Sequence, residues 1–159
     1  TLVRAAYLEG IVRDDNQNLL NNVRITLTGP QNEQEFTDGF GFYSTGVADT
    51  GVYTVKFSKA GYQSRTIQNV VLRSGQTTTL NVELTALNQY VVSGRVLQYG
   101  IGTPVPFAKV KAINEESTFE TQADANGDFT FNAIYEDTFT FYAARWGFRE
   151  NDGMSLIIN

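Results

Sequence analysis

Apolar and polar residues alternate along most of this chain with a period of two. Residues 23–27 read Val-Arg-Ile-Thr-Leu, and residues 53–57 read Tyr-Thr-Val-Lys-Phe. Successive side chains of a β-strand point to opposite faces, so each stretch has one apolar and one polar face. No window of 11 residues carries the apolar stripe of an amphipathic helix. The pattern therefore predicts an all-β protein built from half-buried strands.

Turn-forming residues divide the alternating stretches into strands of ordinary length. In the first half of the chain the predicted strands are residues 6–13, 22–28, 34–38, 41–45, 51–58, 63–72 and 77–84. In the second half they are residues 90–98, 106–113, 117–122, 128–132, 138–145 and 154–158. About seven short strands with turns between them are typical of a β-sandwich.

The second half of the chain repeats the first at a nearly constant spacing. Residues 51–62 align with residues 137–148 at an offset of 86, and their aromatic, basic and final Gly-aromatic positions coincide. An offset of 84 brings residues 10–12 onto residues 94–96. The offset of 86 also aligns Asp38, Gly41 and Tyr43 with Asp124, Gly127 and Phe129. Such a repeat predicts two homologous modules, residues 1–86 and residues 90–159.

The two predicted modules differ at their last strand. At the offset of 86, Leu156 and Ile157 match Val70 and Val71, so the predicted strand 77–84 has no counterpart before Asn159. We therefore expect two tandem Greek-key β-sandwich modules of about seven strands each, with the second lacking its last strand. Either the sequence ends one strand early or a following domain supplies the strand.

A fixed order of short motifs runs through the first module. It comprises a Gly-x-Val strand, a polar turn, an alternating strand, a Thr-Asp-x-x-Gly-x-aromatic turn, a Gly-x-Tyr-x-Val strand and a closing Gly-Tyr pair. These motifs are residues 10–12, 14–22, 23–27, 37–43, 51–55 and 61–62. This order resembles the carboxypeptidase regulatory-like domain family, small β-sandwiches of transthyretin-like (prealbumin-like) topology. Most of the second module resembles the family too, but Asp137 replaces the usual Gly, and Trp146 replaces a small residue.

The resemblance implies a noncatalytic function. Modules of this family often sit beside a peptidase, a glycan-active enzyme or an outer-membrane receptor in larger secreted chains. We therefore expect an accessory module pair of a larger bacterial-type protein, extracellular, on the cell surface or in the periplasm, which acts as a structural spacer or interaction domain. Its partners would be neighbouring domains of the parent chain and a protein or glycan ligand. The alternative function is that of a carbohydrate- or surface-protein-binding module.

Composition removes the commonest catalytic and metal-binding groups. The 159 residues include no His and no Cys, which excludes imidazole and thiolate as base, nucleophile or metal ligand. We predict no enzymatic activity, no catalytic residue, no cofactor and no metal site. The net charge of −5 disfavours nucleic acid, because phosphate binding needs clustered Lys and Arg. No uncharged apolar run reaches about 18 residues, so we expect no membrane insertion.

Two loops partly imitate ligand-binding motifs. Asp124, Asn126 and Asp128 occupy alternate positions, as in the first half of a calcium loop, but Phe129 and Tyr135 stand where that loop requires Gly and Glu. Residues 39–46 are rich in Gly like a phosphate-binding loop, but the third Gly is misplaced and no helix is predicted after them. We interpret both loops as structural turns.

Three aromatic residues are candidates for a sugar-binding platform: Trp146, Tyr99 and Tyr135. Trp and Tyr rings stack well on the apolar faces of sugars. An aromatic side chain at a strand end nevertheless belongs more often to the edge of the core. Exposure of Trp146 and Tyr135 in one patch would favour the binding module, whereas their burial would favour the spacer.

Overall fold

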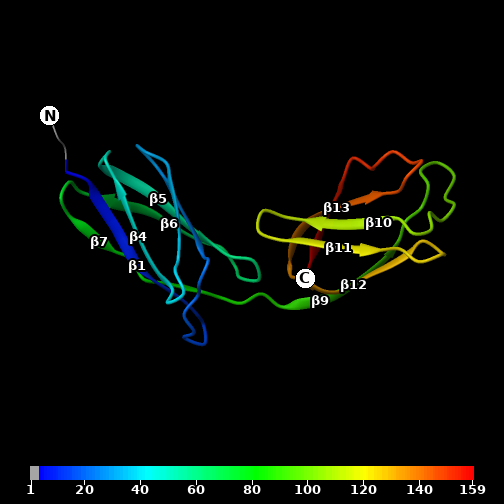
Figure 1. The fold of residues 1–159 in the computed structure, drawn as a ribbon, viewed down its shortest axis with the longest axis horizontal. Helices are drawn as coiled ribbons and strands as arrows, with labels where there is room; N and C mark the ends of the chain where they lie inside the picture. The colour runs from blue at the N-terminus through cyan, green and yellow to red at the C-terminus, as the bar shows by residue number, and fades with distance from the viewer. Residues whose placement is uncertain (1–3) are drawn as a thin grey trace. The chain divides into compact units, whose positions relative to one another are not determined.

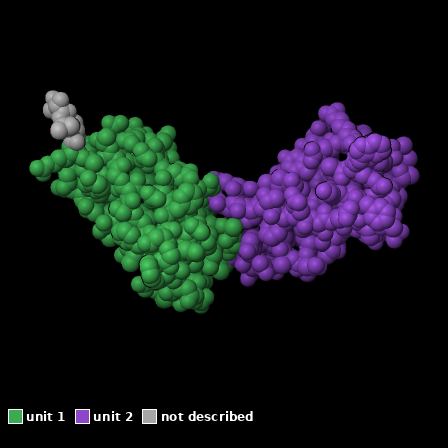
Figure 2. Space-filling model, in the orientation of Figure 1, with its two compact units in different colours: residues 1–86 green, residues 87–159 purple. Residues whose placement is uncertain are grey.

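The computed structural model describes residues 4–159, which form fourteen β-strands and no helix. The chain divides into two compact units, residues Thr1–Ala86 and Leu87–Asn159, shown separately coloured in Figure 2. The predicted all-β fold class with two sandwiches is confirmed. Residues 1–3 of the predicted first module lie outside the described part. No helix among residues 4–159 is long and apolar enough to cross a membrane.

The first unit packs two four-stranded sheets against each other (Figure 1). One sheet contains β4 (Phe42–Val47), β1 (Ala6–Asp14), β7 (Thr77–Thr79) and β8 (Val82–Leu84). The other has the order β3 (Glu33–Phe36), β2 (Arg24–Thr28), β5 (Gly51–Ser58) and β6 (Arg65–Leu72). Strand β1 is central, since it pairs with β4 in the antiparallel sense and with β7 and β8 in the parallel sense.

The alternating side chains of both sheets meet in a single apolar core. Leu8 and Val12 of β1 are fully buried, as are Ile25 of β2 and Phe57 of β5. Tyr43 packs edge-on against Phe57, with ring centroids 5.6 Å apart. Burial of the period-two apolar face stabilises this unit, at about 25 cal/mol per Å² of apolar surface.

The predicted strand 77–84 is interrupted between β7 and β8. A Cβ atom on Gly10 would come within 2.0 Å of the Leu80 carbonyl oxygen, so the Leu80 backbone lies against β1 at a position where only glycine fits. Tyr43 Oη donates a hydrogen bond to that oxygen at 2.7 Å, and Asn81 Oδ1 accepts one from the Ile11 amide at 2.9 Å. These two side chains replace backbone partners, so the ladder breaks at Leu80 and Asn81. Burial raises the pKa of the Tyr43 phenol, which keeps its hydroxyl protonated as a donor.

The second unit has a four-stranded sheet and a two-stranded sheet (Figure 1). The four-stranded sheet has the order β11 (Thr118–Gln122), β10 (Lys109–Ile113), β13 (Asp137–Ala144) and β14 (Met154–Ile158). The other sheet pairs β9 (Gln89–Arg95) with β12 (Asp128–Tyr135). Among residues 87–159 no strand pairs with the other edge of β9, so the expected lack of a last strand is observed.

The strands predicted at residues 22–28 and 106–113 begin later than expected, at Arg24 and Lys109. Asn22 has a φ of 50° and Phe107 a φ of 57°, a left-handed conformation that a strand cannot contain. Each residue donates its amide hydrogen across the unit, Asn22 to the Thr37 carbonyl and Phe107 to the Asp124 carbonyl, at 3.0 Å in both. The two units therefore share a turn that apolar alternation does not reveal.

Candidate functional site

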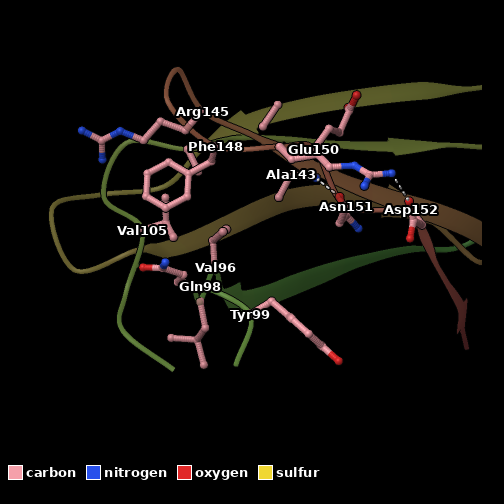
Figure 3. A pocket seen from close by; sticks show the side chains of 14 residues that line it. Val96, Gln98, Tyr99, Val105, Ala143, Arg145, Phe148, Glu150, Asn151 and Asp152 are labelled. Carbon is pink, nitrogen blue, oxygen red and sulfur yellow. Dashed lines mark hydrogen bonds and ion pairs between the residues drawn. The ribbon is translucent and has the colours of Figure 1, made fainter. Parts of the chain in front are cut away.

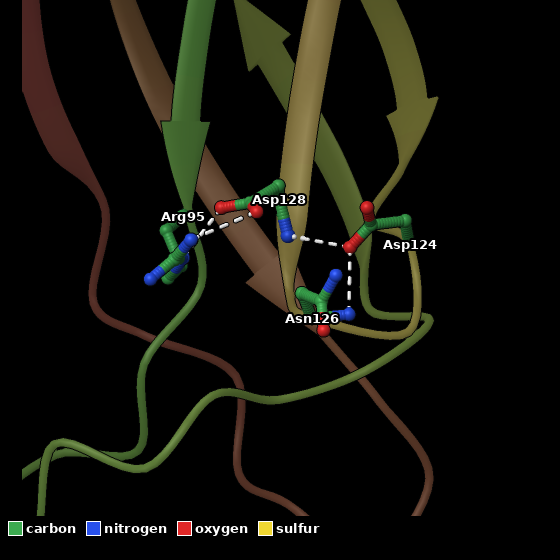
Figure 4. A network of polar contacts seen from close by, with 4 residues as sticks. All are labelled: Arg95, Asp124, Asn126 and Asp128. Atoms are coloured by element: carbon green, nitrogen blue, oxygen red, sulfur yellow. Dashed lines mark hydrogen bonds and ion pairs between the residues drawn. The ribbon is translucent and has the colours of Figure 1, made fainter.

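The Asp-containing turns use their carboxylates to hold the backbone. Asp124 Oδ1 accepts hydrogen bonds from the amides of Asn126 at 2.7 Å and Asp128 at 3.0 Å (Figure 4). Asp38 Oδ1 accepts the equivalent pair in the first unit, at 2.8 and 3.0 Å. Gly127 supplies the left-handed residue of its turn, with a φ of 79°. Among residues 4–159 no group of three His, Cys, Asp or Glu side chains could hold a metal ion.

Asp128 also forms an ion pair that ties the start of β12 to the end of β9. Arg95 donates through Nε to Oδ1 of Asp128 and through Nη2 to Oδ2, the latter at 2.9 Å (Figure 4). The hydrogen bonds from Arg95 hold the pKa of the Asp128 carboxyl below its usual range. The aligned pair in the first unit is Ile11 and Phe42, so this ion pair is a feature of the second unit.

The three aromatic candidates have different environments. Trp146 is 98% exposed and Tyr99 is fully exposed. Tyr135 is partly buried against the second core and packs edge-on against Phe119 at 5.6 Å between ring centroids. The structure therefore places Tyr135 in the fold and leaves Trp146 and Tyr99 accessible.

An open groove of about 740 Å³ lies in the second unit, between the end of β9 and the end of β13 (Figure 3). Val105 and Ala108 are buried beneath it, and Phe148 is among its lining residues (Figure 3). Arg145, Arg149, Glu150 and Asp152 add charges of both signs to its lining. The remaining lining residues are Val96, Leu97, Gln98, Tyr99, Ala143, Ala144 and Asn151. The groove thus combines apolar surface with charged groups.

The segment after β13 forms one wall of the groove and is fixed by Asn151. Asn151 Oδ1 accepts a hydrogen bond from the Ala143 amide at 2.6 Å, and its Nδ2 donates to the Phe141 carbonyl at 3.1 Å. The Arg145 guanidinium lies 5.8 Å from the centroid of the Phe107 ring. Trp146 follows Arg145 in a turn in which the Phe148 amide bonds the Arg145 carbonyl. The exposed Trp146 therefore directly follows Arg145, which lines the groove.

Tyr99 is predicted as a candidate from the sequence, whereas the groove that it lines is not. A usable signal was present, because the offset of 84 places residues 96–98 on residues 12–14, beside the strand that the second module was expected to lack. The groove forms where a strand is absent, so its signal lies in the comparison of the two modules and not in a residue motif.

The match to known families falls on the first unit. Residues 7–85 match the carboxypeptidase regulatory-like domain, and this part of the chain is a domain of that kind.

Two known proteins are similar to the chain over longer stretches. Over 102 residues it is 29% identical to bacillopeptidase F of Bacillus subtilis (strain 168), a match that covers 64% of this chain and 7% of that protein. The chain thus spans a small fraction of this relative's length. A Streptococcal ancillary pilin has a similar structure, with a TM-score of 0.57 and 19% identity over 100% of this chain and 60% of that one. At this identity the similarity shows a shared fold.

Proposed function

We propose that this chain is a noncatalytic accessory part of a larger extracellular or cell-surface protein, in which it acts as a spacer or interaction domain. The match of residues 7–85 to the carboxypeptidase regulatory-like domain carries this proposal. The similarity to 7% of bacillopeptidase F supports it, because a short segment of a long peptidase is what an accessory module would match. Periplasmic location is compatible with the same role.

In this proposal residues 90–159 of the second unit form a divergent copy of the first. The support is its strand register. Strand β1 pairs Gly10 with Tyr43, and β9 pairs Gly94 with Phe129, at offsets of 84 and 86. Likewise, the register of β5 and β6 at Tyr53 recurs in β13 and β14 at Phe139. Unrelated sandwiches would not be expected to share both registers.

Stretching the chain between two handles tests whether it is a spacer made of two independent modules. Two independent modules should unfold in two steps, which release about 290 Å and 250 Å at roughly 3.4 Å per residue. One step that releases the whole length would contradict a pair of modules.

Incubation with casein and chromogenic esters and glycosides tests the noncatalytic part. Turnover that co-purifies with the chain and is lost when it unfolds would contradict that part.

A second candidate function is binding of a glycan or a surface protein. The observation that favours it is the groove, with the exposed Tyr99 in its lining and the exposed Trp146 on the segment that forms its wall. A glycan array probed with the intact chain tests it. Trp146→Ala and Tyr99→Ala should each abolish a specific signal, whereas Tyr7→Ala, at an exposed aromatic of the first unit, should not. A signal unchanged in all three variants would reject this site.

A further inference from the structure

The outer edge of β9 offers a row of backbone groups to an incoming strand. The amides of Val12 and Val96 both face the antiparallel neighbour, since they donate to Gly41 and Gly127. The amides at odd-numbered positions of β1 face the opposite edge. At that edge the Tyr7 amide donates to the Gln76 carbonyl at 2.9 Å. In β9 the corresponding amides face an edge that no strand among residues 87–159 covers. They belong to Val91, Ser93 and Arg95.

The groove continues this edge along the path that β8 takes in the first unit. There β8 pairs with residues 12–14 of β1, and residues 85–86 then contact residues 62–63. Residues 12–14 correspond to residues 96–98 at the offset of 84, and residues 62–63 correspond to residues 148–149 at the offset of 86. All five counterparts line the groove. The open edge and the groove are therefore one continuous site.

Apolar side chains that a covering strand would bury are exposed along this side. Leu156 of β14 pairs with the buried Phe139 and so lies on the core-facing side of its sheet. It is 39% exposed, whereas Val70, its counterpart in the first unit, is 8% exposed. Phe148 is exposed as well, whereas its counterpart Tyr62 packs against the first core.

Gly94 retains the missing Cβ that allows a strand backbone to approach closely in the first unit. A Cβ atom on Gly10 would strike the Leu80 backbone. On Gly94 the three nearest atoms would all belong to the Phe129 ring, the first at 2.6 Å. Phe129 also lacks the hydroxyl by which Tyr43 bonds Leu80. A bound strand would have to move this ring, which makes the ring a reporter of binding.

We infer that the outer edge of β9 and the groove together bind an extended strand of a partner polypeptide. The strand runs parallel to β9, bonds the amides of Val91, Ser93 and Arg95, and carries apolar side chains at alternate positions. Its chemistry is that of residues 77–84, where Leu80, Val82 and Leu84 face the first core. Backbone hydrogen bonds supply affinity in such complexes, and the alternate side chains supply specificity. The inference rests on the proposed equivalence of the two units.

The probe is a capped peptide with the sequence of residues 76–86, titrated into the ¹⁵N-labelled intact chain. We expect chemical-shift changes at Val91, Ser93, Arg95 and residues 96–98, and in the Phe129 ring. The amides of β1 should not shift, because β7 and β8 already cover that edge. A nitroxide on the peptide's N terminus should broaden Val91 more than Gln98. The reverse order would overturn the parallel arrangement.

Two methylated peptides form a matched pair. The Leu80 amide donates to the Glu9 carbonyl in the first unit, so N-methylation at the Leu80 position should weaken binding about tenfold or more. The amide at the Thr79 position points away from the partner strand, and its methylation should leave binding nearly unchanged. Equal effects of the two methylations would contradict strand pairing. So would equal binding of a peptide with Ser at the Leu80, Val82 and Leu84 positions.

A chain-side variant and a fused strand complete the test. Ser93→Pro removes one donor from the open edge while β9 keeps its pairing with β12, and it should weaken peptide binding by a similar factor. Appending residues 74–86 after Asn159 should raise the unfolding temperature of the second unit by at least about 5 °C. If only the appended strand binds, the partner is ruled out and the site serves its own chain. If neither binds, the inference fails, while two-step unfolding would still support the two modules.

Discussion

Phe107 is a bulky aromatic residue in a backbone conformation that favours glycine or asparagine. Its φ is 57°, and Asn22 takes the same conformation at the equivalent turn of the first unit. A left-handed conformation costs a residue with a Cβ about 1–2 kcal/mol, and Asn tolerates it better than others. We expect Phe107→Asn to stabilise the second unit by about 1 kcal/mol, since the lost contact with Arg145 offsets part of the gain. Urea unfolding measures this.

Two control variants separate backbone strain from loss of the ring. Phe107→Ala removes the contact with Arg145 but keeps a Cβ at positive φ, so it should not stabilise the unit. Asn22→Phe should destabilise the first unit, because it introduces the same strain there. If Phe107→Ala stabilises as much as Phe107→Asn, the exposed ring and not the backbone carries the cost.

The ion pair of Asp128 with Arg95 makes the second unit sensitive to acid. The pKa of Asp128 is lowered in the folded state by the hydrogen bonds from Arg95. A depressed folded-state pKa stabilises the protein above about pH 4, the value for unfolded Asp, and this contribution disappears as the pH falls through the lower folded pKa. We therefore expect the stability difference between the wild type and Asp128→Asn to shrink from pH 6 to pH 2.

Urea unfolding at low ionic strength across this pH range is the measurement, because salt screens exposed pairs. Arg95→Gln removes the donor and should reduce the same pH dependence. A difference that stays constant with pH would mean that Asp128 acts through its turn geometry alone.

At the scale of elements, apolar alternation located the strands well, because burial of one face determines where a strand lies. The predicted strand 51–58 coincides with β5, and the predicted strand 154–158 coincides with β14. The errors occur where a local feature interrupts the alternation, such as the left-handed Phe107 or the Leu80 carbonyl above Gly10. The groove escaped prediction because it depends on which strand covers β9, and this information lies in pairing between distant segments.

Hydrogen exchange can compare the covered edge of β1 with the open edge of β9. The Tyr7 amide is bonded to Gln76 and the Ile11 amide to Asn81 Oδ1. The aligned amides of Val91 and Arg95 face the open edge, so they should exchange at least about tenfold faster after correction for intrinsic rates. The amide of Val96, bonded to Gly127, is the internal control and should remain protected. Equal protection of Val91 and Tyr7 would mean that another element covers β9 in solution.

At the scale of the whole molecule, the two units have cores of different size. Residues 4–86 bury sixteen apolar residues in one cluster, whereas residues 87–159 bury nine in two smaller clusters. Strand β8 explains part of the difference, because Val82 and Leu84 close the first core and the second unit has no counterpart. The second core depends more on aromatic contacts, such as Phe131 against Phe141 at 6.0 Å. A smaller core leaves less hydrophobic free energy against the entropy of folding.

Calorimetry of the intact chain should therefore resolve two transitions, with the second unit unfolding at the lower temperature. Leu84→Ala should lower only the upper transition, because Leu84 is buried in the first core, and such truncations cost about 2–5 kcal/mol. Phe139→Ala should lower only the transition of the second unit, whose core buries this ring completely. If each variant shifted both transitions equally, the two units would unfold as one cooperative block. The surface exposed along β9 and β14 would then need a different explanation, because its effect on the stability of the second unit could not be separated from the rest of the chain.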